Sequence, residues 1–172
     1  MVIIPRITFW IAILLGGALL GIYLDARLFA GYLHDVYFHI LTLPLGLVLL
    51  YAVVLVSRNT GRILARMGRV GDLPRMETNR LVTTGVYSCM RHPMHLGLMF
   101  FPLSLALILG SASFIMIIAP AEILLILVMI RFVEEPEAIR KFGDAYIEYM
   151  RHVPAFNLKP SCLAMLFKID AR

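Results

Sequence analysis

Charged residues are scarce in this chain of 172 residues. Lys, Arg, Asp and Glu make up 16% of it, whereas an ordinary soluble domain contains roughly 25%. Hydrophobic residues make up 60%, and the mean hydropathy is +0.86. This composition excludes a typical soluble domain and predicts a single integral-membrane domain over residues 1–172.

Cysteine is also scarce, with only Cys89 and Cys162. They lie far apart and form no C-x-x-C pattern, so neither a metal site nor a disulfide is expected.

The formal charge is +5, but the basic residues cluster between apolar runs, which favours orientation in a membrane over nucleic-acid binding. The first apolar run lacks a clear cleavage site, so we expect a retained span rather than a signal peptide.

Four apolar runs predict an all-α membrane protein with about four transmembrane helices. A polar loop from Asp25 to Asp35 separates the first two runs, and residues 110–113 turn the last two into a helical hairpin. The expected spans are 7–24, 36–56, 94–109 and 114–132.

Gly17 and Gly21 form a G-x-x-x-G pair in the first run, which permits close approach of another helix. Glu122 lies inside the fourth run, where a carboxylate costs about 2.5–3.5 kcal/mol. Its role stays open between a helix–helix hydrogen bond and a contact with a substrate cavity.

Arginine is concentrated in the connection from Ser57 to Arg91, which opposes it with only Asp72 and Glu77. The positive-inside rule therefore places residues 57–91 in the cytoplasm. An even number of spans puts both termini and the segment 134–172 on the same side. The basic stretch 58–69 fits either a helix on an anionic membrane surface or a continuation of the second span. The seven arginines are Arg58, Arg62, Arg66, Arg69, Arg75, Arg80 and Arg91.

Several polar groups crowd against the start of the third run, between Leu81 and Gly97. Pro93 is expected to begin a helix, because proline suits the first helical position and disfavours helical geometry in the preceding residue. The backbone N–H groups that follow would attract a carboxylate or phosphate. The residues alone also allow Arg91 and His92 to be interfacial anchors.

The stretch G-V-Y-S-C-M-R-H-P-M-H-L-G, which begins at Gly85, resembles a known signature. It is similar to the G-x-Y-x-x-x-R-H-P-x-Y-x-G motif of the isoprenylcysteine carboxyl methyltransferase family, which includes phospholipid methyltransferases. Downstream, E-E at 134–135, F-G-D-A-Y-I-E-Y from Phe142 and V-P at 153–154 resemble the family's E-E…F-G-x-x-Y-x-x-Y…V-P tail. The resemblance covers roughly the C-terminal half of the chain.

The resemblance implies an enzyme that transfers a methyl group from S-adenosylmethionine to a lipid-like acceptor, most simply an isoprenylcysteine carboxylate. Its partners would be membrane lipids and a lipid or prenylated substrate reached from the membrane, with no nucleic acid; the oligomeric state stays open. The catalytic candidates are His95, Arg131 and Glu135, and no metal is expected. The residues expected to bind the cofactor are Leu81, Val82, Tyr87, His92, Pro93, Met94, His95 and Glu134.

Three positions depart from the family pattern. His95 replaces the usual tyrosine, Arg131 lies one residue closer to the acidic pair, and Pro136 directly follows Glu135. Pro136 is expected to start an amphipathic helix that covers the site from the cytoplasm. The apolar positions of this helix are Ala138, Ile139, Phe142, Tyr146, Tyr149 and Met150.

Three alternatives remain beside the leading hypothesis. The acceptor of a phospholipid N-methyltransferase would be a headgroup amine, which must lose a proton to a base such as His95 or Glu135. Membrane sterol-type reductases that use NADPH carry a similar R-H-P-N-Y-x-G-E motif, from which this chain departs at Met94, His95 and Leu98. A non-catalytic membrane scaffold is the third alternative.

Overall fold

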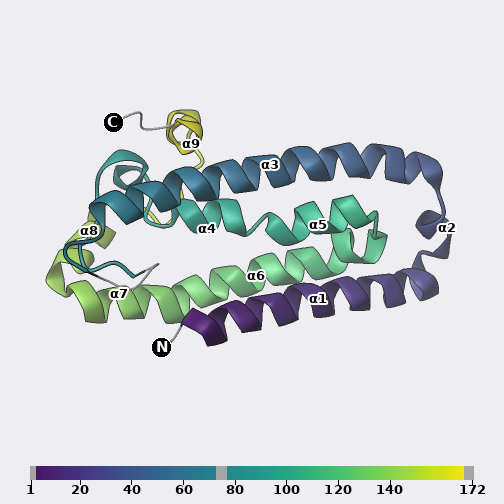
Figure 1. Ribbon diagram of the computed structural model, residues 1–172, viewed down its shortest axis with the longest axis horizontal. Coiled ribbons are helices and arrows are strands. Elements are labelled where there is room, and N and C mark those ends of the chain that lie inside the picture. The colour runs from purple at the N-terminus through teal and green to yellow at the C-terminus, as the bar shows by residue number, and fades with distance from the viewer. Residues whose placement is uncertain (1–2, 73–76, 169–172) are drawn as a thin grey trace. The chain divides into compact units, whose positions relative to one another are not determined.

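The computed structural model describes residues 3–72 and 77–168, which form helices and no β-strand. Figure 1 shows the order of these helices along the chain. The chain divides into two compact units, Met1–Tyr51 with Met99–Ile126 and Ala52–Leu98 with Leu127–Arg172. The all-α class is therefore confirmed for the described part of the chain. The expectations for Arg75 and for the two chain ends lie outside it.

The first unit is built around a small apolar core. α1 (Ile3–Leu28) and α5 (Phe101–Leu109) both pack against the π-helical turn η2 (Phe114–Ile118). The short α2 (Ala30–Leu33) contacts α1. The buried core residues are Ala106, Phe114, Ile118 and Ala119.

The polar loop that was expected to begin at Asp25 begins later in the structure. α1 continues to Leu28, so Asp25 lies inside a helix and is 1% exposed. Its Oδ1 accepts a hydrogen bond from the backbone N–H of Ser113 at 2.6 Å. Because the first N–H groups of a helix have no intrahelical partner, this carboxylate caps the helix that starts the second arm of the hairpin.

The glycine pair lies where other groups approach α1 closely. The Glu122 carboxylate is buried against Gly17, and a Cβ at Gly21 would come within 3.0 Å of Phe114 Cβ. Glycine leaves room for both contacts, so the predicted close approach is confirmed. The hairpin turn is also confirmed, since Gly110 ends α5 at φ 62°.

The second unit contains the part of the chain that carries both motifs. It includes the end of α3 (Val36–Met67), η1 (Gly85–Ser88) and α4 (Pro93–Leu98). Its remaining elements are η3 (Ile130–Glu134), α7 (Glu135–Phe142), α8 (Asp144–His152) and α9 (Pro160–Phe167). α7 packs against η3 and α8, and α9 packs against η1.

The connection expected from Ser57 is in fact helical at its start. α3 runs without interruption from Val36 to Met67, so Arg58, Arg62 and Arg66 lie on a continuation of the second span. Of the two alternatives for the stretch 58–69, the structure therefore shows the continuation of the second span, up to Met67. Arginine is a good helix former, so these charges change the polarity of the helix without ending it.

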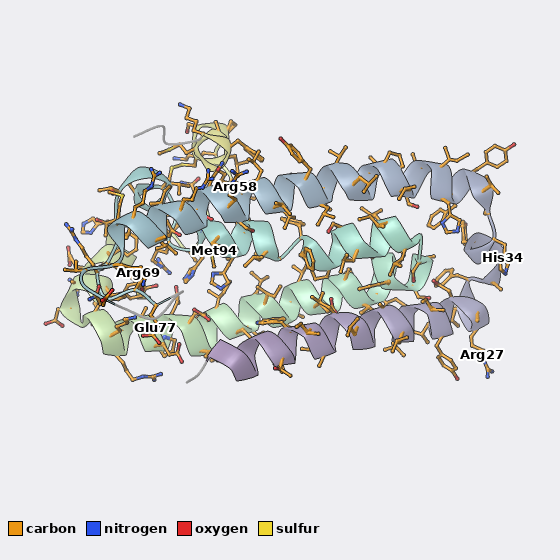
Figure 2. All side chains as sticks on the ribbon, viewed as in Figure 1. Arg27, His34, Arg58, Arg69, Glu77 and Met94 are labelled. Carbon is orange, nitrogen blue, oxygen red and sulfur yellow. A yellow bond between two sulfur atoms is a disulfide. The ribbon has the colours of Figure 1, made fainter. Side chains whose placement is uncertain are left out.

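Three helices in the described residues are long and apolar enough to cross a membrane: Thr8–Leu28, Val36–Met67 and Phe114–Phe142. The expected third span is interrupted, because α4 ends at Leu98 and α5 begins at Phe101 with Pro102 in its first turn. Large apolar side chains are exposed along α1 and α3, as lipid contact requires. Figure 2 shows mostly carbon along α1, with Arg27 near its end.

The amphipathic helix expected from Pro136 differs from the prediction in two ways. The helix continues from η3 into α7, so Pro136 lies in the first turn of α7 without a break before it. Gly143 then ends α7 at φ 58°, and α8 follows as a separate helix.

Candidate functional site

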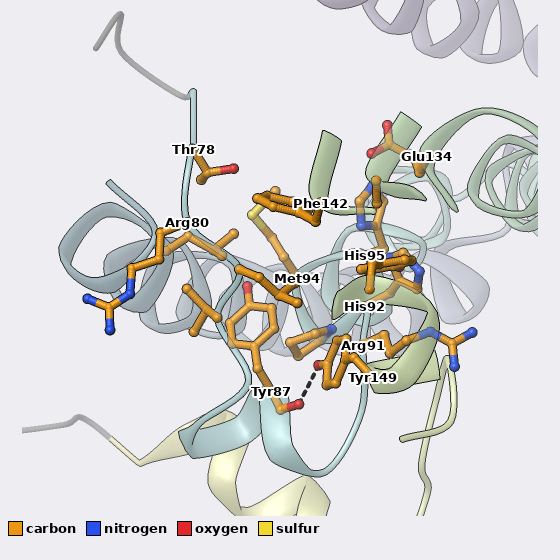
Figure 3. A pocket seen from close by; sticks show the side chains of 16 residues that line it. Thr78, Arg80, Tyr87, Arg91, His92, Met94, His95, Glu134, Phe142 and Tyr149 are labelled. Carbon is orange, nitrogen blue, oxygen red and sulfur yellow. Dashed lines mark hydrogen bonds between the residues drawn. The ribbon is translucent and has the colours of Figure 1, made fainter. Parts of the chain in front are cut away.

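A cavity in the second unit is the candidate site (Figure 3). It measures about 150 Å³ and is open to solvent on one side. The lining residues are Leu64, Thr78, Arg80, Leu81, Val82, Tyr87, Arg91, His92, Pro93, Met94, His95, Glu134, Ala138, Phe142, Tyr146 and Tyr149.

Every residue predicted to bind the cofactor lines this cavity. Seven of the eight come from the first motif region, whereas Glu134 lies about forty residues downstream, just before α7. In Figure 3, His92, His95 and Glu134 lie together on one side of the cavity, and Arg80 and Tyr87 lie on the other. Of the three catalytic candidates, His95 lines the cavity, whereas Arg131 and Glu135 do not.

Asn79 anchors the wall that contains Leu81 and Val82. Its Oδ1 accepts the backbone N–H of Val70 at 2.8 Å, and its Nδ2 donates to the carbonyl of Val70 at 2.8 Å. The backbone N–H groups of Asn79 and Arg80 both donate to the carbonyl of Gly68. These bonds fasten the wall to the chain that leaves the end of α3.

Tyr87 is held from two directions. Its hydroxyl donates to the carbonyl of Thr60 on α3 at 3.5 Å, and its own carbonyl accepts the hydroxyl of Tyr149 on α8. Burial raises the pKa of both phenols, and a neighbouring tyrosine raises each further. Both are therefore neutral hydrogen-bond donors at physiological pH.

Arg91 links the two motifs. Its guanidinium donates to the carboxylate of Glu135 and to the carbonyl of Val153, and its side chain is only 9% exposed. Such burial excludes the interpretation of Arg91 as an interfacial anchor, because an anchor keeps its charged group at the membrane surface. Glu135 also accepts from Arg131 at 3.2 Å, so two arginines share one buried carboxylate.

His92 is buried beside this ion pair. Burial, and after it the neighbouring His95, lower the pKa of His92 to about 4, so its imidazole is neutral at pH 7. Its Nε2 lies 3.5 Å from Glu135 Oε1 and makes no hydrogen bond with any residue that the structure describes. Arg91 Nε is a second buried donor without such a bond. Buried polar atoms are normally hydrogen-bonded, so these two donors are exceptions.

Arg131 lies outside the cavity. Its side chain is 69% exposed, and its described ion pair is with Glu135, one turn along the same helix. Arg131 therefore does not line the cavity, but it lies close to Glu135, the carboxylate that pairs with Arg91.

Half of the lining residues were not predicted to bind the cofactor, although Ala138, Phe142, Tyr146 and Tyr149 were expected on the apolar face of a helix that covers the site. Phe142, Tyr146 and Tyr149 belong to the F-G-x-x-Y-x-x-Y motif, so their spacing was a usable signal. Arg91 belongs to the R-H-P motif in the same way. Leu64 and Thr78 carried no comparable signal, because only the fold brings the end of α3 and the segment before Leu81 to the cavity.

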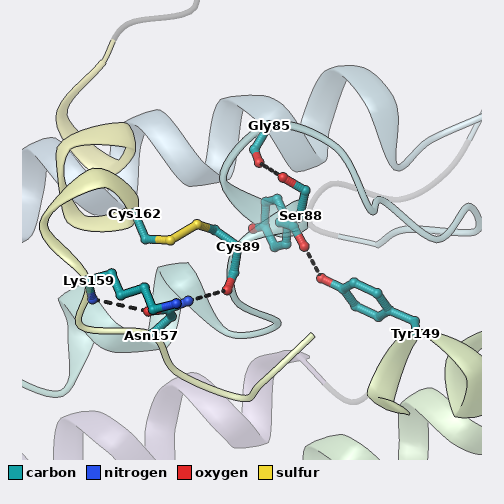
Figure 4. The surroundings of a disulfide bond; sticks show 8 residues. Gly85, Ser88, Cys89, Tyr149, Asn157, Lys159 and Cys162 are labelled. Carbon is teal, nitrogen blue, oxygen red and sulfur yellow. Dashed lines mark hydrogen bonds between the residues drawn. A yellow bond between two sulfur atoms is a disulfide. The ribbon is translucent and has the colours of Figure 1, made fainter. Parts of the chain in front are cut away.

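The expectation of no disulfide was wrong. Cys89, which follows η1, is bonded to Cys162 on α9, with the two Cα atoms 5.8 Å apart (Figure 4). The pair is 73 residues apart in sequence and matches no local spacing pattern, so only the fold could reveal it. Within the described residues, no group of three or more His, Cys, Asp or Glu could hold a metal ion.

Comparison with known proteins agrees with the motifs. The model of the phospholipid methyltransferase family matches residues 41–145, which is more than half of the chain. A protein-S-isoprenylcysteine O-methyltransferase from Schizosaccharomyces pombe (strain 972 / ATCC 24843) is 30% identical over 87 residues. That alignment covers 47% of this chain and 34% of the relative, so the chain spans about a third of that protein. No solved structure matches the chain. The family match includes the R-H-P motif and the acidic pair Glu134 and Glu135, and this chain belongs to the phospholipid methyltransferase family.

Proposed function

We propose that this chain is an integral-membrane methyltransferase that uses S-adenosylmethionine and a lipid-like acceptor. The observation that carries the proposal is the meeting of two separate motifs at one cavity, which is lined by all eight residues predicted to contact the donor. The name of the S. pombe relative, an isoprenylcysteine O-methyltransferase, supports the same chemistry. We treat residues 1–172 as one such domain.

The cavity fits the donor's groups. The neutral imidazole of His92, which lines the cavity, suits the methionine carboxylate together with the N–H groups after Pro93. α4 has only six residues, so its dipole adds little and His92 is the stronger contact. Glu134 suits the ribose hydroxyls or the ammonium group, and the Tyr87 ring with Leu81 and Val82 forms an apolar wall for adenine.

The donor, when bound, supplies a methyl group on a positively charged sulfur. The chain's task is to hold the acceptor in line with that methyl group and to exclude water. Tyr87, Phe142 and Tyr149 provide apolar surface at the cavity for this purpose. Glu135 holds Arg91 by an ion pair, which makes it a positioning residue in this scheme.

The acceptor decides whether a base is needed. A carboxylate acceptor, such as that of an isoprenylcysteine, is already nucleophilic. An amine of a phospholipid headgroup must first lose a proton, and His95 is the candidate base that lines the cavity. Arg131 is exposed close to the site and suits the acceptor's carboxylate or phosphate as a bidentate partner.

We also propose the topology that the sequence favours. The broken segment Pro93–Leu109 forms a fourth crossing together with the three longer helices. Irregular backbone inside a membrane protein is tolerated where neighbouring helices bury it, which allows the interruption before Phe101. The basic residues that follow the apolar part of α3 favour a site on the cytoplasmic side.

Calorimetric titration of the purified protein in detergent tests the donor assignment. We expect S-adenosylmethionine and S-adenosylhomocysteine to bind, and NADPH not to bind. Glu134→Gln should weaken binding by about tenfold or more, because it removes a charged hydrogen-bond acceptor. Glu137→Gln, which changes a carboxylate of α7 outside the cavity lining, is the matched control. Binding of NADPH alone would refute the proposal.

A further inference from the structure

The segment 153–159, which follows α8 and is called the tail below, is hydrogen-bonded to the loop that carries the first motif. The backbone N–H of Arg91 donates to the carbonyl of Pro154 at 3.0 Å, and that of His92 donates to Ala155 at 3.1 Å. Asn157 Nδ2 donates to the carbonyl of Cys89 at 3.3 Å. The conformation of the loop between η1 and α4 therefore depends on this tail being in place, because unpaired buried backbone groups are costly.

The tail in turn depends on α9. This helix has eight residues, too few to be stable by itself in water. Cys162 and Leu166 are its buried side chains, and the carbonyl of Leu166 accepts a hydrogen bond from Asn59 of α3 at 3.1 Å. The covalent bond from Cys162 to Cys89 is the strongest attachment of α9 within the described residues.

Cys89 lies between two residues of the cavity wall. Tyr87 precedes it by two positions, His92 follows it by three, and both line the cavity. Figure 4 shows Cys89 with the disulfide on one side and the Asn157 hydrogen bond to its carbonyl. Opening the disulfide would release α9 and the tail from the same short loop that places Tyr87 and His92.

We infer that the Cys89–Cys162 disulfide is a positioning element of the donor cavity, so that donor affinity depends on the oxidation state of this pair. The inference rests on the proposed function. A dithiol opens the bond by donating two electrons and two protons: the S–S bond breaks, two thiols form on the protein, and the dithiol becomes a cyclic disulfide. The closed pair preorganises the wall, and the open pair leaves Tyr87 and His92 to be ordered when the donor binds.

The experiment titrates S-adenosylhomocysteine into the full chain in detergent, oxidised and after reduction with dithiothreitol, with thiols counted by maleimide labelling and mass spectrometry. We expect reduction to weaken binding by about tenfold, as the cost of ordering two side chains suggests. Oxidation with oxidised dithiothreitol should restore it. In turnover assays the KM for the donor should rise while kcat at saturating donor stays the same.

Two variants sharpen the result. Cys89→Ser with Cys162→Ser should bind like the reduced protein and should not respond to dithiothreitol. Ala164→Ser, at an exposed position of α9, should respond like the unsubstituted chain. Circular dichroism checks that the helices survive reduction.

Equal affinity in the oxidised and reduced proteins would overturn the inference, as would two free thiols that resist oxidation. Loss of helical signal on reduction would also overturn it, because the bond would then support the whole fold rather than the cavity wall. Absence of binding by a folded, oxidised protein would instead overturn the proposed function.

Discussion

Glu135 shows how differently neighbouring carboxylates are used. Glu134 faces the cavity, whereas Glu135 is buried between Arg91 and Arg131 and is 3% exposed. A buried ion pair adds little net stability, but removing one partner leaves a buried charge without compensation. The role expected of Glu135 as a catalytic group stays a prediction, and its contacts favour positioning.

Glu135→Gln should therefore lower stability by about 3 kcal/mol or more, because Arg91 loses its buried counter-charge. Thermal unfolding in detergent measures the change. Glu148→Gln removes an exposed ion pair with Arg151 and should cost less than about 1 kcal/mol. Equal effects of the two substitutions would contradict a buried, structural ion pair.

His92 should make the protein sensitive to acid. Its pKa in the folded chain is about 4, below its ordinary value of about 6.5, because burial disfavours the imidazolium. Between these values the unfolded chain binds more protons than the folded one, so stability should fall as the pH decreases from about 6.5 to 4.

Melting temperatures measured from pH 7.5 to 4.5 test this expectation. The decline should be shallower in His92→Gln, which cannot titrate. His152→Gln, at an exposed position of α8, should retain the full decline. An identical pH profile for the His92 variant and the unsubstituted chain would show that another group is responsible.

At the scale of elements, the cavity wall before η1 depends on one side-chain amide. Asn79 makes hydrogen bonds to both the N–H and the carbonyl of Val70. Asn79→Ala removes both bonds. Asn79→Asp keeps the acceptor for the N–H of Val70, but it places a carboxylate oxygen against the Val70 carbonyl, which then has no donor. Both should weaken binding of S-adenosylhomocysteine by about five- to tenfold, since the wall must then be ordered on binding.

Calorimetry measures this effect, with Thr83→Ala as a control at an exposed position of the same segment. Circular dichroism should be unchanged, because the bonds lie outside the helices. Normal affinity in Asn79→Ala would mean that the wall keeps its shape without the two hydrogen bonds between Asn79 and Val70.

The helices also show which element boundaries the pattern could predict. Pro93 begins α4 and Gly110 ends α5 as expected, because both residues restrict or permit specific backbone angles. The sequence left the end of α3 open between two alternatives, because arginines mark the limit of apolarity rather than of the helix. The division at Gly143 was missed, because apolar spacing continues across it and only its positive φ separates α7 from α8.

At the scale of the whole molecule, orientation is the central prediction. Seven arginines favour a cytoplasmic location for residues 57–91, whereas a disulfide at Cys89 is typical of oxidising compartments. The positive-inside rule concerns insertion itself, so we expect it to decide the orientation. Whether the disulfide is formed then depends on the redox state of the cytoplasmic side and does not indicate the topology.

Single cysteines introduced at Arg69 and at Tyr37, in a chain whose native cysteines are replaced by serine, test the orientation. Both positions are outside the described apolar cores, and Tyr37 is 85% exposed. A membrane-impermeant maleimide should label the Arg69 position from the cytoplasmic side and the Tyr37 position from the opposite side. Labelling in the reverse pattern would reject the proposed topology.

The sequence alone determined the helical class, the apolar helices long enough to cross a membrane, and the family with its R-H-P motif, because composition and local motifs encode these directly. Tertiary structure decided which of those residues share a cavity, that Arg91 and Glu135 form its buried support, and that Cys89 meets Cys162. These are contacts between segments tens of residues apart. Residue spacing within a segment cannot specify them, because they arise only when the helices pack.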